Sequence, residues 1–348
     1  MSGDLRYRFG DYTSEVLIRG TADPAVFSSD CATVAVFDKN TAEVPIFEYS
    51  GQRLVLAPGE ASKSWSEARR ILQRALDGGL GRDGLIVGVG GGVICDLAAF
   101  SASLYMRGCR LMLVPTSLLA MVDAAIGGKT AINLGGFKNM AGTFYPAERI
   151  WIYVSVLRHL PAREFLSGLG EVIKTALLGD RELLEILLKQ SSKVCGGDPE
   201  VMEEIVRRCI AVKAGIVEGD PREAGNRAVL NLGHTFGHAL EAETGYELYS
   251  HGEAVAWGLL QAAVLSQTLG LADAGYTATV RELLENYHFE MNFNRKPESI
   301  VRAMQADKKK RRGKLRLVLQ RGIGDTVIRE VDPHLIVQTL QNSARVFP

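Results

Sequence analysis

Hydrophobic residues follow one pattern in the first half of the chain, where short apolar runs alternate with amphipathic segments. Four of the runs, each with the polar or glycine residues that follow it, are "VAVFDKN", "RLVLAPGE", "LIVGVGGG" and "LMLVPTS". A fifth is "RIWIYVSVL". Between the second and the third, residues 64–79 have the periodicity of an amphipathic helix that ends at a glycine pair. Strands that are apolar along their whole length and separated by helices are typical of a parallel sheet covered on both faces.

The pattern changes near residue 160, after which helical periodicity dominates. Segments 161–190, 199–220 and 252–274 repeat apolar residues at helical spacing and show few alternating β-branched residues. We therefore expect an α/β, Rossmann-like domain with a parallel sheet over residues 1–157. An all-α domain is expected over residues 158–348.

Composition narrows the class of protein. The 348 residues suffice for two domains, and 47% of them are hydrophobic, which excludes global disorder. Forty basic residues balance forty acidic ones, so the chain has no general attraction to nucleic acid or to an anionic membrane. The first residues lack the apolar core of a signal peptide. No stretch of about 18 residues is apolar enough to span a bilayer. Five scattered cysteines indicate a reducing compartment. We expect a cytoplasmic protein.

A glycine-rich turn, "GVGGGVICDL", stands between an apolar run and a helical segment. Glycines at this point let a phosphate approach backbone N–H groups at a helix N-terminus. Val93 replaces the last glycine of a strict GxGxxG, so a tight connection without ligand is an equal alternative on this motif alone. Asp38, Glu60 and Lys63 also follow the ends of predicted strands, where ligands of such sheets bind. Together these positions favour a dinucleotide.

Three of the six histidines lie in "NLGHTFGHALEAETGYELYSHGEAVAWG", residues 231–258. His234 and His238 are four residues apart, which places both rings on one face of a helix, and His251 follows after a loop-like interval. Spacing alone favours His234 and His238 as a pair of metal ligands. Proton carriers and packed core histidines remain alternatives.

Charged and amide side chains gather in three further segments, beside glycine pairs or inside apolar helical runs. An unpaired charge is costly in such surroundings, so the set suits a small, strongly anionic substrate. Its members are Asp123, Lys129, Lys138, Asn139, Glu171, Lys174, Lys213, Glu223, Arg227 and Asn231.

Seven strings carry a resemblance to a known family, and they occur in the family's order over nearly the whole chain. They are "GGGVICDL", "YMRG", "VPTSLLAMVDAAIGGKTAIN", "KNMAGTFYP", "LPAREFLSGLGEVIK", "NLGHTFGHALE" and "HGEAVAWG". The chain resembles the 3-dehydroquinate synthases, which are sugar phosphate cyclases of the shikimate pathway. The resemblance implies a homodimeric lyase that converts 3-deoxy-D-arabino-heptulosonate 7-phosphate to 3-dehydroquinate and phosphate. It also implies a transient NAD-dependent oxidation at C5, phosphate elimination, re-reduction and an intramolecular aldol closure.

The resemblance also assigns roles to residues. Glu171, His234 and His251 would bind zinc or cobalt, with coordination positions left open for catalysis, and His238 would transfer protons. NAD contacts are implied for Asp38, Glu60, Lys63, Gly91, Gly92, Asp96, Thr116, Ser117, Lys129, Lys138 and His159. Substrate contacts are implied for Asp123, Lys129, Lys138, Asn139, Lys174, Lys213, Glu223, Arg227 and Asn231, for Arg107 across the dimer interface, and for Lys308 or Lys309.

The chain departs from the family pattern around the expected cofactor. Cys95 replaces a glycine, Ser117 and His159 replace threonines, and "NLGGFK" replaces the family's "NHP" stretch. Three alternatives remain: a cyclase for another sugar phosphate, a metal-dependent alcohol or glycerol dehydrogenase, and a non-catalytic binding protein. The joint presence of Lys213, Arg227 and Asn231 favours the dehydroquinate reaction.

Overall fold

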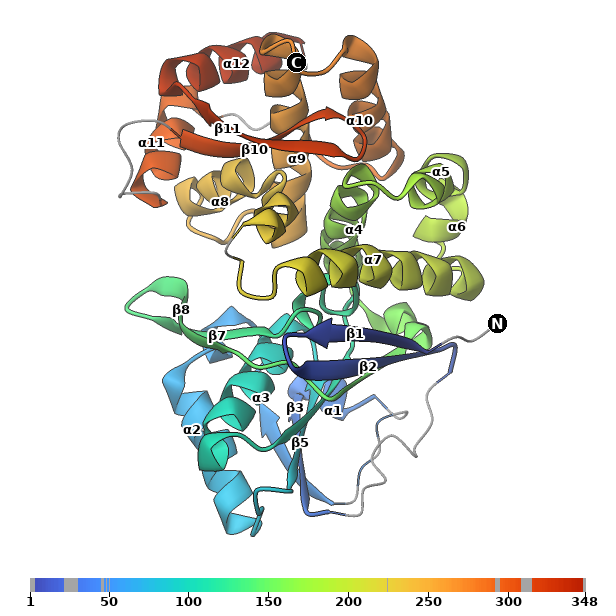
Figure 1. Cartoon of the computed structure of the whole chain (residues 1–348), viewed down its shortest axis with the longest axis vertical. Coiled ribbons are helices and arrows are strands. Elements are labelled where there is room, and N and C mark those ends of the chain that lie inside the picture. Colours follow the sequence, from blue (N-terminus) through green and yellow to red (C-terminus); the bar gives the residue numbers. More distant parts are fainter. Residues whose placement is uncertain are drawn as a thin grey trace. The chain divides into compact units, whose positions relative to one another are not determined.

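A computed structural model describes residues 4–21, 31–44, 47, 49, 51–223, 225–291, 295–307 and 315–346 (Figure 1). Contacts within the chain group it into two units, residues 1–160 with 202–222 and residues 161–201 with 223–348. The domain boundary after residue 157 remains a prediction. Lys308 and Lys309 lie outside the described residues.

The first unit is built on a seven-stranded sheet with the order β1-β2-β9-β6-β5-β3-β4. All neighbouring strands are parallel except the hairpin formed by β1 and β2. The strands are β1 (Leu5–Phe9), β2 (Tyr12–Arg19), β3 (Thr33–Asp38), β4 (Gln52–Leu56), β5 (Leu85–Gly90), β6 (Arg110–Pro115) and β9 (Arg149–Tyr153). Every residue of β5 is buried, as the continuous apolar run predicts. The predicted α/β class of this region is confirmed.

Helices α2 and α3 of the first unit pack against the sheet (Figure 1). Ser64 caps α2 by accepting a hydrogen bond from Glu67 N, and α3 begins directly at the glycine turn. The remaining elements are α1 (Lys39–Ala42), η3 (Glu60–Ser62), α2 (Trp65–Asp77), α3 (Gly92–Leu104), η4 (Tyr105–Arg107), η5 (Ala120–Ala124), β7 (Lys129–Leu134), β8 (Phe137–Phe144), η6 (Val154–His159) and most of α7 (Pro199–Gly219). The hairpin of β7 and β8 stands apart from the main sheet.

The second unit is rich in helices, with α9 in contact with α4, α8, α10, α12 and β10. Its elements are α4 (Ala162–Leu177), α5 (Arg181–Lys189), α6 (Ser191–Cys195), η7 (Asn226–Asn231), α8 (His234–Glu243), α9 (His251–Thr268), α10 (Ala274–Asn286), α11 (Pro297–Asp307), β10 (Leu315–Gly322), β11 (Asp325–Val331) and α12 (Pro333–Val346). The prediction that this region is all helix is wrong in one respect, because β10 and β11 form an antiparallel hairpin. Buried Gln320 attaches that hairpin to the core, since its amide donates to Leu177 O at 2.7 Å and its Oε1 accepts from Tyr276 Oη.

Helices α4 and α9 cross at a contact that only glycine permits. A Cβ at Gly252 would lie 1.8 Å from the carbonyl oxygen of Ser167, and one at Gly170 would lie 2.3 Å from the carbonyl oxygen of Gly252. Gly252 N also donates to Ser167 Oγ at 3.1 Å. This backbone contact brings Glu171, the next residue of α4, close to His251, the first residue of α9.

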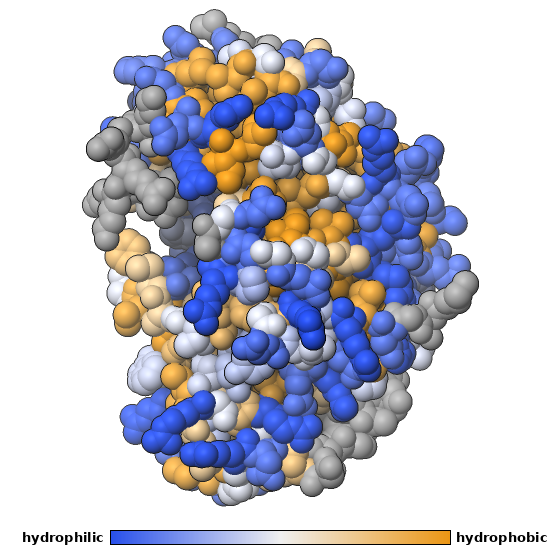
Figure 2. Space-filling view, viewed as in Figure 1, coloured by the Kyte–Doolittle hydropathy of each residue, from blue (hydrophilic) through white to orange (hydrophobic). Residues whose placement is uncertain are grey.

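On the face shown in Figure 2, hydrophilic residues are interrupted by hydrophobic areas. Large exposed apolar side chains include Leu134, Phe137 and Met140 on the hairpin of β7 and β8. All five cysteines lie in the described part of the chain and are free thiols. No helix among the described residues has the length and hydropathy needed to cross a bilayer.

Candidate active site

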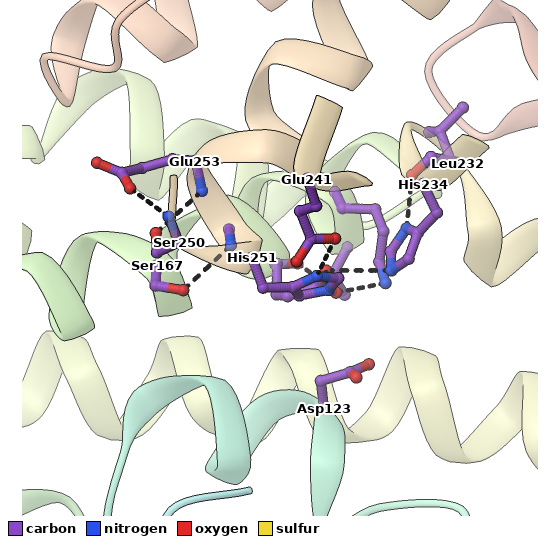
Figure 3. A network of polar contacts seen from close by, with 12 residues as sticks. Asp123, Ser167, Leu232, His234, Glu241, Ser250, His251 and Glu253 are labelled. Atoms are coloured by element: carbon purple, nitrogen blue, oxygen red, sulfur yellow. Dashed lines mark hydrogen bonds and ion pairs between the residues drawn. The ribbon is translucent and has the colours of Figure 1, made fainter. Parts of the chain in front are cut away.

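One carboxylate and two imidazoles converge in the second unit. Glu171 Oε1 lies 3.5 Å from His234 Nε2 and 3.6 Å from His251 Nε2, and the side chain of Glu171 is only 1% exposed. Both histidines are the first residues of their helices. Gly233, with φ of 77°, turns the chain into α8, while Ser250 and Glu253 form a capping box that begins α9 (Figure 3).

The other ring nitrogen of each histidine has its own partner (Figure 3). His234 Nδ1 lies 3.2 Å from the carbonyl oxygen of Leu232, and His251 Nδ1 lies 3.4 Å from Glu241 Oε2. Carbonyl and carboxylate oxygens only accept hydrogen bonds, so we assign the proton of each neutral ring to Nδ1. In His234, and in His251 once a bound metal ion has displaced its second proton, this tautomer leaves the Nε2 lone pair facing Glu171.

Burial and neighbouring charges set the protonation of this cluster. Burial alone would raise the pKa of Glu171, but the Lys174 ammonium and the two histidines hold it well below its usual range. Burial, helped by Lys174, lowers the pKa of His234 to about 3. Burial also acts to lower the pKa of His251, but the neighbouring carboxylates of Glu171 and Glu241 raise it to about 10 in the metal-free cluster. Glu171 is thus a carboxylate and His234 is a neutral imidazole at neutral pH.

The geometry fits a divalent metal ion. By hydrogen-bond geometry neither oxygen of buried Glu171 has a partner among the described residues, although Lys174 makes an ion pair with Oε2. Ligand atoms on a tetrahedral zinc ion, with bonds of about 2.0–2.1 Å, lie about 3.3 Å apart. The two distances from Glu171 Oε1 are close to that value. A set of two imidazoles and one carboxylate suits zinc or cobalt and leaves coordination positions open.

His238 lies beside the cluster without being part of it. Its ring centroid is 5.4 Å from that of His234 and 5.9 Å from that of His251, and its side chain is exposed. The ligand set that contains His234 includes His251 and Glu171, whereas His238 belongs to a second set with Glu241 and His251. The pairing suggested by spacing, His234 with His238, is therefore not the pairing that the three-residue geometry favours.

The segment before α8 holds three further predicted residues. Asn231 Nδ2 donates to Glu223 Oε1 at 2.9 Å, and Arg227 is 2% exposed. Glu223 has a positive φ of 55°, which few non-glycine residues adopt. A deeply buried guanidinium needs anionic partners, so this segment suits the recognition of an anion.

In the first unit, several predicted cofactor residues meet at the carboxyl ends of the strands. Lys63 is buried, makes an ion pair with Asp96 and donates to Asn139 Oδ1 at 2.5 Å. Burial raises the pKa of Asp96 to about 6, although Lys63 opposes this shift. Asp38 caps α1 by accepting from Thr41 N at 2.8 Å. The polar groups thus lie at the edge where open α/β sheets bind ligands.

Packing requires some glycines of the turn but not others. A Cβ at Gly88 or Gly90 would lie 2.7 Å from side-chain atoms of α3, so packing requires these two glycines. A Cβ at Gly91 or Gly92 would meet nothing closer than 3.4 Å. Because packing does not demand Gly91 and Gly92, close approach of a ligand to their backbone is the better explanation.

Asn133 was not among the predicted residues, yet it connects the hairpin of β7 and β8 to the Glu60–Lys63 segment. Its Nδ2 donates to Glu60 Oε1 at 2.7 Å, its Oδ1 accepts from Asn139 N at 2.9 Å, and its N–H donates to Lys63 O at 2.8 Å. Its place in "KTAIN" is the only sequence signal for it. Glu241 is buried on α8, and the sequence around it likewise gives no sign of a functional role.

The other predicted residues of the first unit occupy different surroundings. Lys213 Nζ donates to both the Oδ1 and the carbonyl oxygen of Asp123, each at 2.6 Å. Thr116 and Ser117 are buried directly after β6. The residues that lie toward solvent or are half-buried are Arg107, Lys129, Lys138 and His159. Cys95 is buried, with its Sγ 3.6 Å from Gly90 O, where it does not obstruct the turn.

Solved structures of sugar phosphate cyclases have the fold of this chain. A 2-deoxy-scyllo-inosose synthase complexed with carbaglucose-6-phosphate, NAD+ and Co2+ superimposes with a TM-score of 0.87 over 98% of this chain and 100% of that one, at 24% identity. A 2-epi-5-epi-valiolone synthase from Streptomyces hygroscopicus subsp. jinggangensis 5008, with NAD+ and Zn2+ bound, gives 0.85 over 97% and 99%, at 25% identity. The fold is that of these sugar phosphate cyclases.

Sequence comparison identifies the family within this class. The family models for the 3-dehydroquinate synthase N-terminal and C-terminal regions match residues 53–167 and 168–310. The 3-dehydroquinate synthase of Xanthomonas campestris pv. campestris (strain 8004) is 42% identical over 295 residues, which is 82% of this chain and 80% of that protein. The chain belongs to the 3-dehydroquinate synthase family. The predicted family and the predicted activity, that of a carbon–oxygen lyase, are confirmed.

Proposed function

We propose that the chain converts 3-deoxy-D-arabino-heptulosonate 7-phosphate to 3-dehydroquinate and phosphate, with NAD and a zinc or cobalt ion as cofactors. The observation that carries this proposal is the cluster of Glu171, His234 and His251, in a chain of this family. Both imidazoles direct Nε2 toward a buried carboxylate, and three protein ligands leave space for a substrate oxygen.

The metal ligands and their neighbours prepare the site for oxidation of an alcohol. A bound divalent ion supplies Lewis-acid polarisation of the substrate's C5 oxygen. Lys174 holds the Glu171 carboxylate in its charged form, and His238, exposed beside the cluster, takes the proton of the substrate hydroxyl. Solvent exposure of His238 gives that proton a route to water.

NAD binding is proposed at the carboxyl edge of the parallel sheet. Gly91 and Gly92 leave their backbone open to the pyrophosphate, and Lys63 and Asp96 form a buried ion pair beside it. Asp38, Glu60, Thr116, Ser117 and His159 complete the proposed set. NAD supplies a hydride acceptor that is regenerated in each turnover, so it is needed only in catalytic amount.

A set of cationic and amide side chains explains the choice of an anionic substrate. Lys129, Lys138, Asn139 and Asn231 are proposed to bind the phosphate, and Lys308 or Lys309 is proposed as a further contact. Lys213 and Arg227 are proposed to bind the carboxylate, because a guanidinium pairs with a carboxylate through two parallel hydrogen bonds. Asp123 and Glu223 hold Lys213 and Asn231 in place. A dehydrogenase for a neutral alcohol would have no use for this set.

The decisive assay follows phosphate release from the heptulosonate phosphate with catalytic NAD and added zinc or cobalt. We expect release that EDTA abolishes, 3-dehydroquinate as product, and no accumulation of NADH. His238→Ala should lose most of the activity, while His334→Ala, an exposed histidine at the start of α12, serves as the matched control. NADH formed in proportion to product would instead identify a dehydrogenase. Folded, metal-loaded protein without turnover would redirect the search to other sugar phosphates.

We also propose a cytoplasmic homodimer in which Arg107 reaches the site of the partner. Arg107 is exposed and has a positive φ of 69°, a strained backbone that solvent alone does not explain. Mixing Arg107→Ala protein with His238→Ala protein tests the sharing of sites. Mixed dimers contain one site with both native residues, so activity should return on mixing; two variants that remain inactive together would contradict the proposal.

A further inference from the structure

We propose that Glu241 is a positioning residue of the metal centre, which holds the ring of His251 through Nδ1 and so aims Nε2 at the metal. This inference rests on the proposed metal-binding function of Glu171, His234 and His251. Glu241 itself is not a ligand in this arrangement.

The contact lies between two helices of the second unit. Glu241 is buried in α8, two turns after His234, and its Oε2 lies 3.4 Å from Nδ1 of His251 at the start of α9 (Figure 3). A carboxylate pays a desolvation cost at a buried position, and an apolar residue would pack there without that cost. The retained charge therefore needs a partner, and the ring of His251 faces it.

The two histidine ligands differ in how they are held. His234 is 12% exposed and its Nδ1 faces the carbonyl of the adjacent Leu232, within its own chain segment. His251 is 31% exposed and begins its helix after a loop, so local structure restrains it less. A charged acceptor from another helix compensates for this, because hydrogen bonds to ions are stronger than those to neutral groups.

The consequence for metal binding follows from imidazole chemistry. A ring that donates its Nδ1 proton to a carboxylate presents the Nε2 lone pair and becomes a better electron donor. Loss of such an outer partner lowers metal affinity by about 10–100-fold in known sites. Glu241 also lies near His238, since ligand atoms of His238, Glu241 and His251 are all within 4.8 Å of one another. A second metal ion bound by that set is the competing explanation.

The test measures Co2+ binding to the full chain without substrate or NAD, by titration of the visible absorption of the ion against a competing chelator. Glu241→Ala should bind Co2+ about 10–100-fold more weakly. Glu241→Gln keeps an acceptor of the same shape without the charge and should lose about 3–10-fold, a smaller effect because neutral acceptors are weaker. Glu243→Gln, exposed on the same helix, is the matched control and should bind as the unchanged chain does.

Three outcomes would overturn the proposal. If Glu241→Gln binds Co2+ as tightly as the unchanged chain, the negative charge of Glu241 has no role in metal binding. If Glu241→Gln and Glu241→Ala lose the same affinity, Glu241 does not orient His251 through a hydrogen bond. Binding of two Co2+ ions per chain would indicate that Glu241 is itself a metal ligand. If Glu241→Ala does not fold, the glutamine variant decides. Co2+ binding that depends on Glu241 in a protein that releases no phosphate would keep this inference and reject the proposed reaction.

Discussion

The ion pair of Glu171 and Lys174, one turn apart on α4, lies almost wholly inside the second unit, with side chains 1% and 3% exposed. Lys174→Met removes the cation and keeps most of the volume. In metal-free protein this leaves a buried carboxylate that has lost its closest positive charge. We therefore expect a large loss of stability, and we expect the pKa of Glu171 to rise because burial is then less opposed.

The magnitude follows from the nearly complete burial of both groups. Removal of one partner of a buried pair costs about 3–5 kcal/mol, whereas replacement of both by neutral groups of similar size is often close to neutral. The single variants Lys174→Met and Glu171→Gln should each lose about that amount, and the double variant should lose far less. At about 2–4 °C per kcal/mol, each single loss lowers Tm by roughly 10 °C.

Urea unfolding in EDTA, followed by circular dichroism, measures the three variants and the unchanged chain as a double-mutant cycle. A coupling free energy of about 2 kcal/mol or more is expected. Losses that add within about 0.5 kcal/mol would refute the reasoning, because they would show that the two charges do not depend on each other. Added zinc should restore part of the stability of Lys174→Met, since an ion that binds only the folded state stabilises it.

Other contacts give predictions of similar kind. Gly252→Ala should cost more than about 1–3 kcal/mol in thermal unfolding, because its Cβ would lie 1.8 Å from a backbone carbonyl of α4, while exposed Gly215→Ala should cost nothing. Asn133→Ala removes two side-chain hydrogen bonds, one to Glu60, and should weaken NAD binding roughly tenfold by calorimetry; an unchanged Kd would contradict this. Burial raises the pKa of the Cys109 thiol to about 12, so the folded state keeps a proton that the unfolded state loses near pH 9. The free energy of unfolding should therefore fall from pH 9 upward, and less steeply in Cys109→Ala.

Much of the fold could be predicted from local pattern, because the strands of the parallel sheet are apolar on both faces. The hairpin of β7 and β8 gave no such signal, since most of its side chains are exposed and no apolar alternation marks it. Its turn has positive φ at Gly135 and Gly136, which sequence shows only as a glycine pair. The hairpin of β10 and β11 has no regular alternation of buried and exposed residues either, and helical segments flank it in the sequence.

The candidate site depended on tertiary contacts that local pattern does not contain. Spacing favoured His234 with His238, while the three-residue cluster needs His251 and Glu171, which come from two other helices. Their meeting depends on the close crossing of α4 and α9. The resemblance to a family supplied what periodicity could not. Nothing in "ALEAE" distinguishes Glu241 from Glu243, and only the burial of Glu241 sets it apart.

The helix crossing and the carboxylate of Glu241 would contribute to the proposed metal centre in separable ways. Ligand atoms about 3.3 Å apart require helix backbones held within a fraction of an ångström, and the contact of Gly170 with Gly252 sets that spacing for α4 and α9. A variant that opens this crossing must lose packing and metal affinity together. A variant of Glu241 leaves the backbone contact intact and changes only the aim of one ring. Comparison of stability with Co2+ affinity across both kinds of variant therefore distinguishes the geometry of the helices from the orientation of the ligand.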